Sequence, residues 1–172
     1  MDPSLDRIRA IALDIDGVLT DGSVIPLADG DLLRVMDAQD ALAIRVANMK
    51  GYIVAIMSGG DTEALRNRME VMGIRAENIF LGCRGKLAIF ERFCAKNGLS
   101  PEEVMYIGDD LPDVPVLRAA GLGIAPADAA QDAKDAADRI SPCGGGKRCV
   151  RTEIERLMRY QGKWEFDYAK VF

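Results

Sequence analysis

The 172-residue sequence contains no histidine, and this absence narrows the possible chemistry. It excludes Ser-His-Asp and Cys-His catalysis, histidine general bases and zinc sites built on histidine. The four cysteines form no C-x-x-C pair, which favours reduced structural thiols. The chain also lacks an apolar run near the ~20 residues that a membrane span needs, and its first residues are not typical of a signal peptide. We therefore expect a cytoplasmic protein with no membrane partner.

Basic residues are fewer than acidic ones, 22 compared with 27, so the net charge is -5. No basic stretch is long enough to indicate a nucleic-acid surface. Any chemistry must then use carboxylates, lysine, hydroxyl groups or a hard metal ion held by oxygen atoms.

Short apolar runs alternate with segments of helical periodicity along the chain. This alternation predicts an α/β, Rossmann-like fold with a mostly parallel sheet, helices on both faces and one domain over residues 1–172. Strands are expected at 8–15, 52–57, 79–81, 104–107 and 122–125. Helices are expected at 40–50, 62–72, 86–97, 111–120 and 127–137, and again after a glycine-rich loop at 143–148 as far as about residue 160.

Residues 23–36 interrupt the alternation with two short apolar segments around Asp29-Gly30. An Asp-Gly pair between apolar segments is typical of a β-hairpin. Pro26 cannot donate a backbone hydrogen bond, so its strand is expected at an edge.

Reactive side chains follow four of the predicted strands. In parallel sheets ligands bind beyond the carboxyl ends of the strands, so these side chains should share one edge. Carboxylates packed together repel and raise one another's pKa, which a divalent cation relieves. A site whose ligands are all oxygen atoms favours Mg²⁺ over zinc. The residues in question are Asp14 and Asp16, Ser58, Lys86, and Asp109 and Asp110 with Asp113 one turn later.

A phosphate group would also find donors at this edge. Ser58-Gly59-Gly60 lies between a predicted strand and a helix, where a hydroxyl and backbone N–H groups can hold an anion. Lys86 adds a point charge. Each feature alone has an ordinary explanation as a solvated strand end, a loop, a surface lysine or a helix cap. Their joint placement at strand ends favours phosphoryl transfer.

The combined motifs resemble the haloacid dehalogenase-like (HAD) phosphatase superfamily. They are D-I-D-G-V-L-T-D-G at 14–22, Ser58-Gly59, Lys86 and G-D-D-L-P-D at 108–113. Together with the hairpin, the late glycine-rich loop and Gln161-Gly162-Lys163, they are similar to the 3-deoxy-D-manno-octulosonate (KDO) 8-phosphate phosphatases. This similarity covers nearly the whole chain.

The resemblance implies roles for the acidic residues. Asp14 would attack phosphorus and become an aspartyl-phosphate, and Asp16 would act as general acid and then general base. Mg²⁺ would be held by the carboxylates of Asp14 and Asp109 and by the backbone carbonyl of Asp16. Asp110 and Asp113 would support this site.

The resemblance also implies the phosphate contacts and the assembly. Ser58, Gly59 and Lys86 would hold the phosphoryl oxygens. Relatives lack a large cap domain and form homotetramers through the hairpin, with a neighbouring subunit covering the site. The substrate would be a small phosphorylated sugar acid.

The contacts to the sugar depart in part from the family pattern. Gly60, Arg68, Lys147 and Arg151 are the candidates, and Lys147 replaces an arginine of the late loop, which loses bidentate geometry. Gln39-Asp40-Ala41 stands where relatives often have Arg-Asp-Gly. The branch that acts on nonulosonate (KDN or N-acylneuraminate) 9-phosphates tends to carry Glu at position 60, so Gly60 favours KDO 8-phosphate.

Three alternatives remain at this stage. The first is a nonulosonate 9-phosphate phosphatase. The second is a receiver-like phospho-acceptor module, although such modules place adjacent acids early and the acceptor in mid-chain. The third is an inactive relative that serves as a scaffold, against which the intact acid and lysine set argues.

Overall fold

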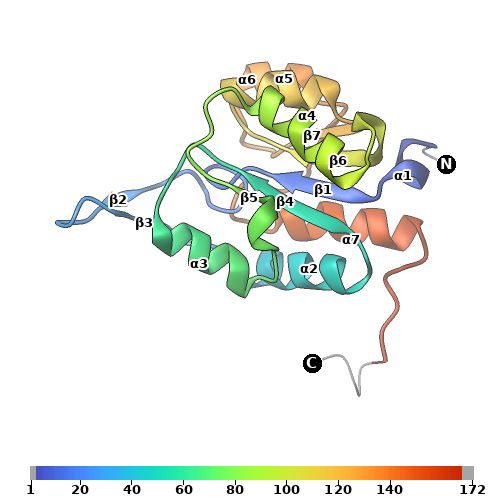
Figure 1. The fold of residues 1–172 in the computed structure, drawn as a ribbon, viewed down its shortest axis with the longest axis horizontal. Coiled ribbons are helices and arrows are strands. Elements are labelled where there is room, and N and C mark those ends of the chain that lie inside the picture. Colours follow the sequence, from blue (N-terminus) through green and yellow to red (C-terminus); the bar gives the residue numbers. More distant parts are fainter. Residues whose placement is uncertain (1–2, 168–172) are drawn as a thin grey trace.

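A six-stranded parallel sheet organises the part of the chain that the computed structural model describes, residues 3–167 (Figure 1). The ends of the predicted domain, 1–2 and 168–172, lie outside the described residues. The order is β5-β4-β1-β6-β7-β8, and every neighbouring pair is parallel. The strands are β1 (Ala10–Leu13), β4 (Ile53–Met57), β5 (Ile79–Phe80), β6 (Val104–Ile107), β7 (Leu122–Ala125) and β8 (Arg139–Ile140).

Helices cover both faces of this sheet, which confirms the predicted fold class (Figure 1). One face carries α1 (Pro3–Arg7), α2 (Ala38–Met49), α3 (Glu63–Val71) and α7 (Cys149–Tyr160). The other carries α4 (Lys86–Asn97), α5 (Val114–Ala119) and α6 (Gln131–Ala136). Short 3-10 helices occur at η1 (Ala76–Asn78), η2 (Pro101–Glu103) and η3 (Leu111–Asp113). Within residues 3–167 we find no helix long and apolar enough to cross a membrane.

The alternation of side chains along the central strands produces two hydrophobic cores. In β1, Ile11 and Leu13 join the core under α2 and α7, whereas Ala10 and Ala12 join the core under α4 and α5. β4 and β6 divide their side chains in the same way. Because successive strand residues point to opposite faces, a central strand buried on both sides reads as a continuous apolar run. The residues that follow β1, β4 and β6 therefore extend from strands that are packed on both faces.

The hairpin is present but very short. β2 (Ile25–Pro26) pairs antiparallel with β3 (Leu32–Leu33), and the Leu27 N–H donates to the Asp31 carbonyl at 2.8 Å across the turn. The two strands project away from the sheet (Figure 1). No large cap domain occurs within the described residues.

Several element boundaries differ from the predictions. The first strand spans 10–13 rather than 8–15, and the segment 111–120 begins as η3 before it becomes α5. The helix expected at 127–137 begins only at Gln131, because Pro126–Ala129 forms a turn closed by the Ala129 N–H. The sequence patterns did not predict α1 or β8, whose few residues carry little periodicity.

Candidate active site

The predicted reactive residues meet at the carboxyl edge of the three central strands. Asp14 follows β1, and its N–H donates to the Ile107 carbonyl of β6 at 3.0 Å. Ser58 follows β4, and its N–H donates to Phe80 of β5 at 3.0 Å. Asp109 follows β6 after one glycine. Because adjacent strands lie roughly 4.8 Å apart, these ends are close neighbours.

A buried lysine links two of the carboxylates. Lys86 is the first residue of α4, and its Nζ lies 2.7 Å from Asp14 Oδ2 and 2.7 Å from Asp113 Oδ1. The exposed fractions are 5% for Lys86, 7% for Asp14 and 0% for Asp113. Burial lowers the pKa of the Lys86 ammonium, but the two carboxylates outweigh it and leave that pKa above its ordinary value. Lys86 is therefore a fixed positive charge.

Asp113 is fully satisfied by donors from its own chain. Its Oδ1 accepts from Lys86 and from the buried Tyr106 hydroxyl, and its Oδ2 accepts from the N–H groups of Asp109 at 3.1 Å and Asp110 at 3.3 Å. This carboxylate therefore holds both the lysine and the loop after β6. The Asp110 side chain is exposed and accepts from the Leu111 N–H at 2.8 Å.

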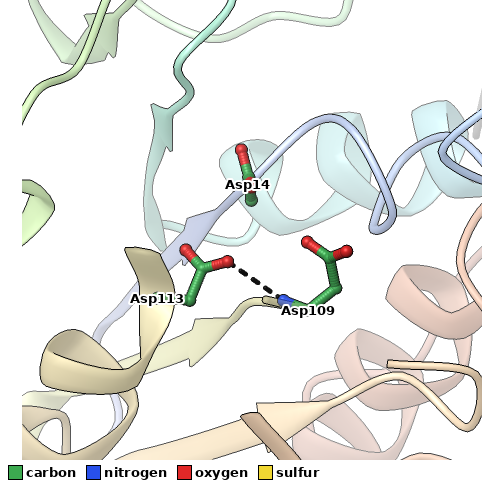
Figure 2. Close-up of side chains that lie close together, drawn as sticks. All are labelled: Asp14, Asp109 and Asp113. Atoms are coloured by element: carbon green, nitrogen blue, oxygen red, sulfur yellow. Dashed lines mark hydrogen bonds between the residues drawn. The ribbon is translucent and has the colours of Figure 1, made fainter. Parts of the chain in front are cut away.

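The carboxylates of Asp14, Asp109 and Asp113 could hold a metal ion. One oxygen from each lies within 4.8 Å of the others (Figure 2). Burial raises the pKa of Asp14 to about 6, and burial together with the charge of Asp14 raises the pKa of Asp109 to about 7. Three carboxylates with one lysine beside them leave an excess of negative charge, and such a set of oxygen donors fits a hard divalent cation. Each Asp113 oxygen accepts from two donors, whereas each Asp14 oxygen has one, the Ile15 N–H at 2.7 Å and Lys86 at 2.7 Å. Asp14 and Asp109 therefore keep more lone pairs for a metal ion than Asp113 does.

Backbone shape around these acids depends on two glycines. Gly17 has φ +83°, and a Cβ there would lie 2.0 Å from Asp109 Oδ2. Gly145 of the late loop packs so closely that a Cβ would lie 2.0 Å from the Gly17 carbonyl oxygen. The late loop is thus seated against the loop that follows β1.

Asp16 pairs with an arginine that the sequence reasoning missed. Arg34, directly after β3 in the hairpin, places Nε 2.7 Å from Asp16 Oδ1 and Nη2 3.1 Å from Oδ2. The hydrogen bond to Asp16 raises the pKa of the guanidinium above its ordinary value. Tyr106 was also missed, because a tyrosine in an apolar strand reads as core. No local signal in the sequence distinguishes either residue.

Two of the predicted phosphate contacts, Ser58 and Gly59, lie in the loop between β4 and α3. The buried Ser58 hydroxyl accepts from the Gly60 N–H at 3.3 Å, and Gly59 is exposed. Thr62 caps α3 by accepting from the Leu65 N–H. The Ser58 and Lys86 side chains are thus both buried near the same strand ends.

The predicted sugar contacts are more dispersed. Arg68 lines a groove of about 380 Å³ between the hairpin and α3, together with Arg34. Lys147 is exposed. Hydrogen bonds from Ser23 lower the pKa of Asp21, and the charge of Lys147 lowers it further. Arg151 pairs with Glu155 at 2.9 Å and lies over Trp164 at 4.6 Å. No contact among the described residues joins Lys147 or Arg151 to the carboxylates of Asp14, Asp109 or Asp113.

Comparison with known proteins gives one consistent result. Residues 29–121 match the family described as haloacid dehalogenase-like hydrolase. The KDO 8-phosphate phosphatase KdsC of Escherichia coli K12 is 35% identical over 165 residues, which cover 96% of this chain and 86% of that protein.

Solved structures agree with this result. A probable YrbI family phosphatase from Pseudomonas syringae superposes with a TM-score of 0.91 at 34% identity, over 97% of this chain and 94% of that one. The KDO 8-phosphate phosphatase of Moraxella catarrhalis, solved with magnesium, phosphate and KDO, has a TM-score of 0.91 at 29% identity, over 99% of this chain and 97% of that one.

Proposed function

The chain belongs to the haloacid dehalogenase-like hydrolases, among the KDO 8-phosphate phosphatases, and from this we propose that it hydrolyses KDO 8-phosphate to KDO and phosphate. It is a phosphoric monoester hydrolase by family. The observation that carries the proposal is the buried Lys86 held between Asp14 and Asp113, with Asp109 beside them. This arrangement supplies a nucleophile, a cation and metal ligands at one strand edge.

The first half of the reaction forms an aspartyl-phosphate. An Asp14 carboxylate oxygen attacks phosphorus, and the bond from phosphorus to the sugar oxygen breaks. Asp16 gives a proton to that oxygen, and the sugar acid leaves as an alcohol. Lys86, Ser58 and the backbone N–H of Gly59 hold the phosphoryl oxygens and offset their charge.

The proposed cofactor is Mg²⁺. Its ligands would be the Asp14 and Asp109 carboxylates and the Asp16 backbone carbonyl, with Asp110 and Asp113 in support. When bound, it neutralises phosphoryl charge and relieves the repulsion between the two carboxylates. The pKa values of Asp14 and Asp109, raised to about 6 and about 7, support this assignment.

The proposed substrate is the eight-carbon sugar acid rather than a nine-carbon one. A Cβ at Gly60 would lie 3.0 Å from Leu65 Cδ1 and 3.3 Å from Arg34 Nη2. A glutamate there would therefore compete with Asp16 for the guanidinium. Arg68 in the groove, with Lys147 and Arg151 of the late loop region, remain the proposed partners of the sugar carboxylate.

We also propose a homotetrameric, cytoplasmic enzyme assembled through the hairpin. The hairpin exposes five large apolar side chains, which is unusual for a free surface. Their exposed fractions are 42% for Val24, 60% for Ile25, 42% for Leu27, 44% for Leu33 and 74% for Val35.

The mechanism is tested by Asp14→Asn. The amide is a poor nucleophile, so turnover should fall by at least about 10⁴-fold while the fold persists. Phosphate release with Mg²⁺ and KDO 8-phosphate measures turnover, and thermal unfolding checks the fold. Normal turnover would end the proposal, and so would a stable phospho-protein in the unsubstituted chain, which would indicate the receiver-like module.

The substrate is tested by comparing kcat/KM for KDO 8-phosphate with that for a nonulosonate 9-phosphate. We expect a preference of at least about tenfold for KDO 8-phosphate, since the two differ in the carbons between phosphate and carboxylate. A reversed preference would assign the chain to the nine-carbon branch.

A further inference from the structure

The contact between Arg34 and Asp16 is the most specific feature that the reaction scheme above leaves unused. The Arg34 guanidinium reaches both carboxylate oxygens, at 2.7 and 3.1 Å, and its Nη1 donates to the Leu32 carbonyl at 3.3 Å. The arginine side chain is only 7% exposed, while that of Asp16 is 35% exposed. Two parallel charge-assisted bonds fix the plane of the carboxylate as well as its position.

Arg34 is itself held on more than one side. It follows β3, so the hairpin carries its backbone, and its Nη2 passes beneath Gly60 close enough that a Cβ would lie 3.3 Å away. It also lines the groove between the hairpin and α3. The guanidinium is therefore fixed with respect to both the hairpin and the loop after β4.

We propose that Arg34 is a positioning residue for the second half of the reaction, in which it holds Asp16 in place as the general base. The inference rests on the proposed function, because it takes Asp16 as the acid and base of an aspartyl-phosphate cycle. In this half, a water oxygen attacks phosphorus and the bond from phosphorus to the Asp14 oxygen breaks. The water proton passes to the Asp16 carboxylate, and inorganic phosphate and the Asp14 carboxylate are released.

The geometry points to the second half rather than to the first. In the first half the departing oxygen is already bound to phosphorus, whereas in the second half Asp16 must meet a free water, so the fixed direction of its carboxylate matters most there. With both oxygens aligned by Arg34, the remaining lone pairs keep one orientation, which aids removal of the water proton. Arg34 touches neither phosphorus nor water in this scheme and acts through Asp16.

4-Nitrophenyl phosphate with Mg²⁺ isolates this half, because its leaving group departs without a proton. For Arg34→Gln we expect kcat to fall by about 10- to 100-fold with kcat/KM within about threefold of the unsubstituted enzyme. A burst of one nitrophenol per active site should precede the slow phase, and acid-quenched protein should carry one phosphoryl group by mass. Arg34→Lys keeps the charge but loses the two-point contact. Its kcat should therefore lie between that of Arg34→Gln and that of the unsubstituted enzyme.

Controls separate this inference from the mechanism on which it rests. Arg9→Lys alters another arginine–carboxylate pair, with Glu103 at 2.8 Å near the opposite end of β1, and should leave the kinetics unchanged. Asp16→Asn should show the same burst with a larger loss of kcat. If it accumulates no phospho-protein, the proposed function fails.

If Asp16→Asn shows the burst and both Arg34 variants do not, only the inference fails. Equal losses of kcat and kcat/KM in Arg34→Lys, or a reduced burst amplitude in a folded variant, would also overturn it, since either result indicates a merely structural role. The unfolding temperature of each variant identifies which proteins are folded.

Discussion

The carboxylate cluster and the hairpin are held in place in opposite ways. In the cluster, Lys86 and Asp113 are buried, and every Asp113 oxygen has donors from a helix, a strand or a loop of the same chain. The hairpin has strands of two residues and exposes 74% of Val35, while its Arg34 reaches inward to Asp16. The surroundings of Asp14, the proposed nucleophile, thus come from several elements of one chain, whereas the hairpin that carries Arg34 has little packing of its own.

The largest expected effect comes from breaking the cluster with Lys86→Met. Removing the ammonium leaves Asp14 and Asp113 buried without their cation, which costs about 3–5 kcal/mol of stability. We expect kcat to fall by at least about 10³-fold, because in the proposed reaction the phosphoryl oxygens would lose their fixed charge. Thermal unfolding and phosphate release measure the two effects.

Lys96→Met provides the matched control on the same helix. Its Nζ donates to the Glu77 carbonyl at an exposed site, at 3.3 Å, so we expect activity within about twofold of the unsubstituted enzyme. If Lys86→Met keeps a tenth of the activity, Lys86 is not the fixed charge of the site.

Disruption of the hairpin should have a smaller effect. Val35→Asp puts a charge on the proposed subunit contact, so the assembly should dissociate and Arg34 should lose part of its support. We expect a lower mass by light scattering and a fall in kcat of about tenfold, without the loss of stability of Lys86→Met.

Val71→Asp introduces the same charge at an exposed valine of α3, 61% exposed, and should change neither mass nor kcat. An unchanged mass for Val35→Asp would remove the hairpin from the assembly. A lower mass with full activity would show that the hairpin keeps Arg34 in place without a neighbour.

The same contrast explains what the sequence could predict. Apolar runs that end in acids located β1 and β6, and parallel strands then bring Asp14 and Asp109 together whatever the loops do. The sequence could not assign separate roles to the acids of G-D-D-x-x-D. The burial of Asp113 and the exposure of Asp110 depend on the path of η3. Arg34 lies 18 residues from Asp16 on a hairpin whose direction no periodicity encodes.

The smallest expected effect concerns Asp40, a buried carboxylate that lies outside the cluster. Asp40 of α2 is 1% exposed, and its Oδ1 accepts from the Arg151 N–H at 2.6 Å, but Oδ2 has no partner among the described residues. Burial raises its pKa from 3.8 to about 6. Unlike Asp113, this carboxylate forms no ion pair with a lysine, and burial outweighs the nearby charge of Arg148 in setting its pKa, so its charge should be a cost rather than a support.

The pH dependence of Asp40→Asn follows from that raised pKa. Between pH 4 and 6 the folded protein keeps a proton on Asp40 that the unfolded chain releases. The stability from this residue is therefore complete below about pH 4 and is lost as the pH rises through about 6. Asparagine keeps the acceptor for Arg151 without the charge, so the variant should gain on the unsubstituted protein between pH 4 and 7. The gain should be at most about 3 kcal/mol.

Urea unfolding of both proteins at pH 4 and 7 measures this difference. Asp132→Asn, at an exposed position of α6, provides the control and should show a difference that stays flat within about 0.5 kcal/mol. If Asp40→Asn instead loses stability at pH 7 relative to pH 4, the ionised Asp40 supports the start of α7. A carboxylate could then be buried in this protein without a lysine beside it, as well as in the cluster.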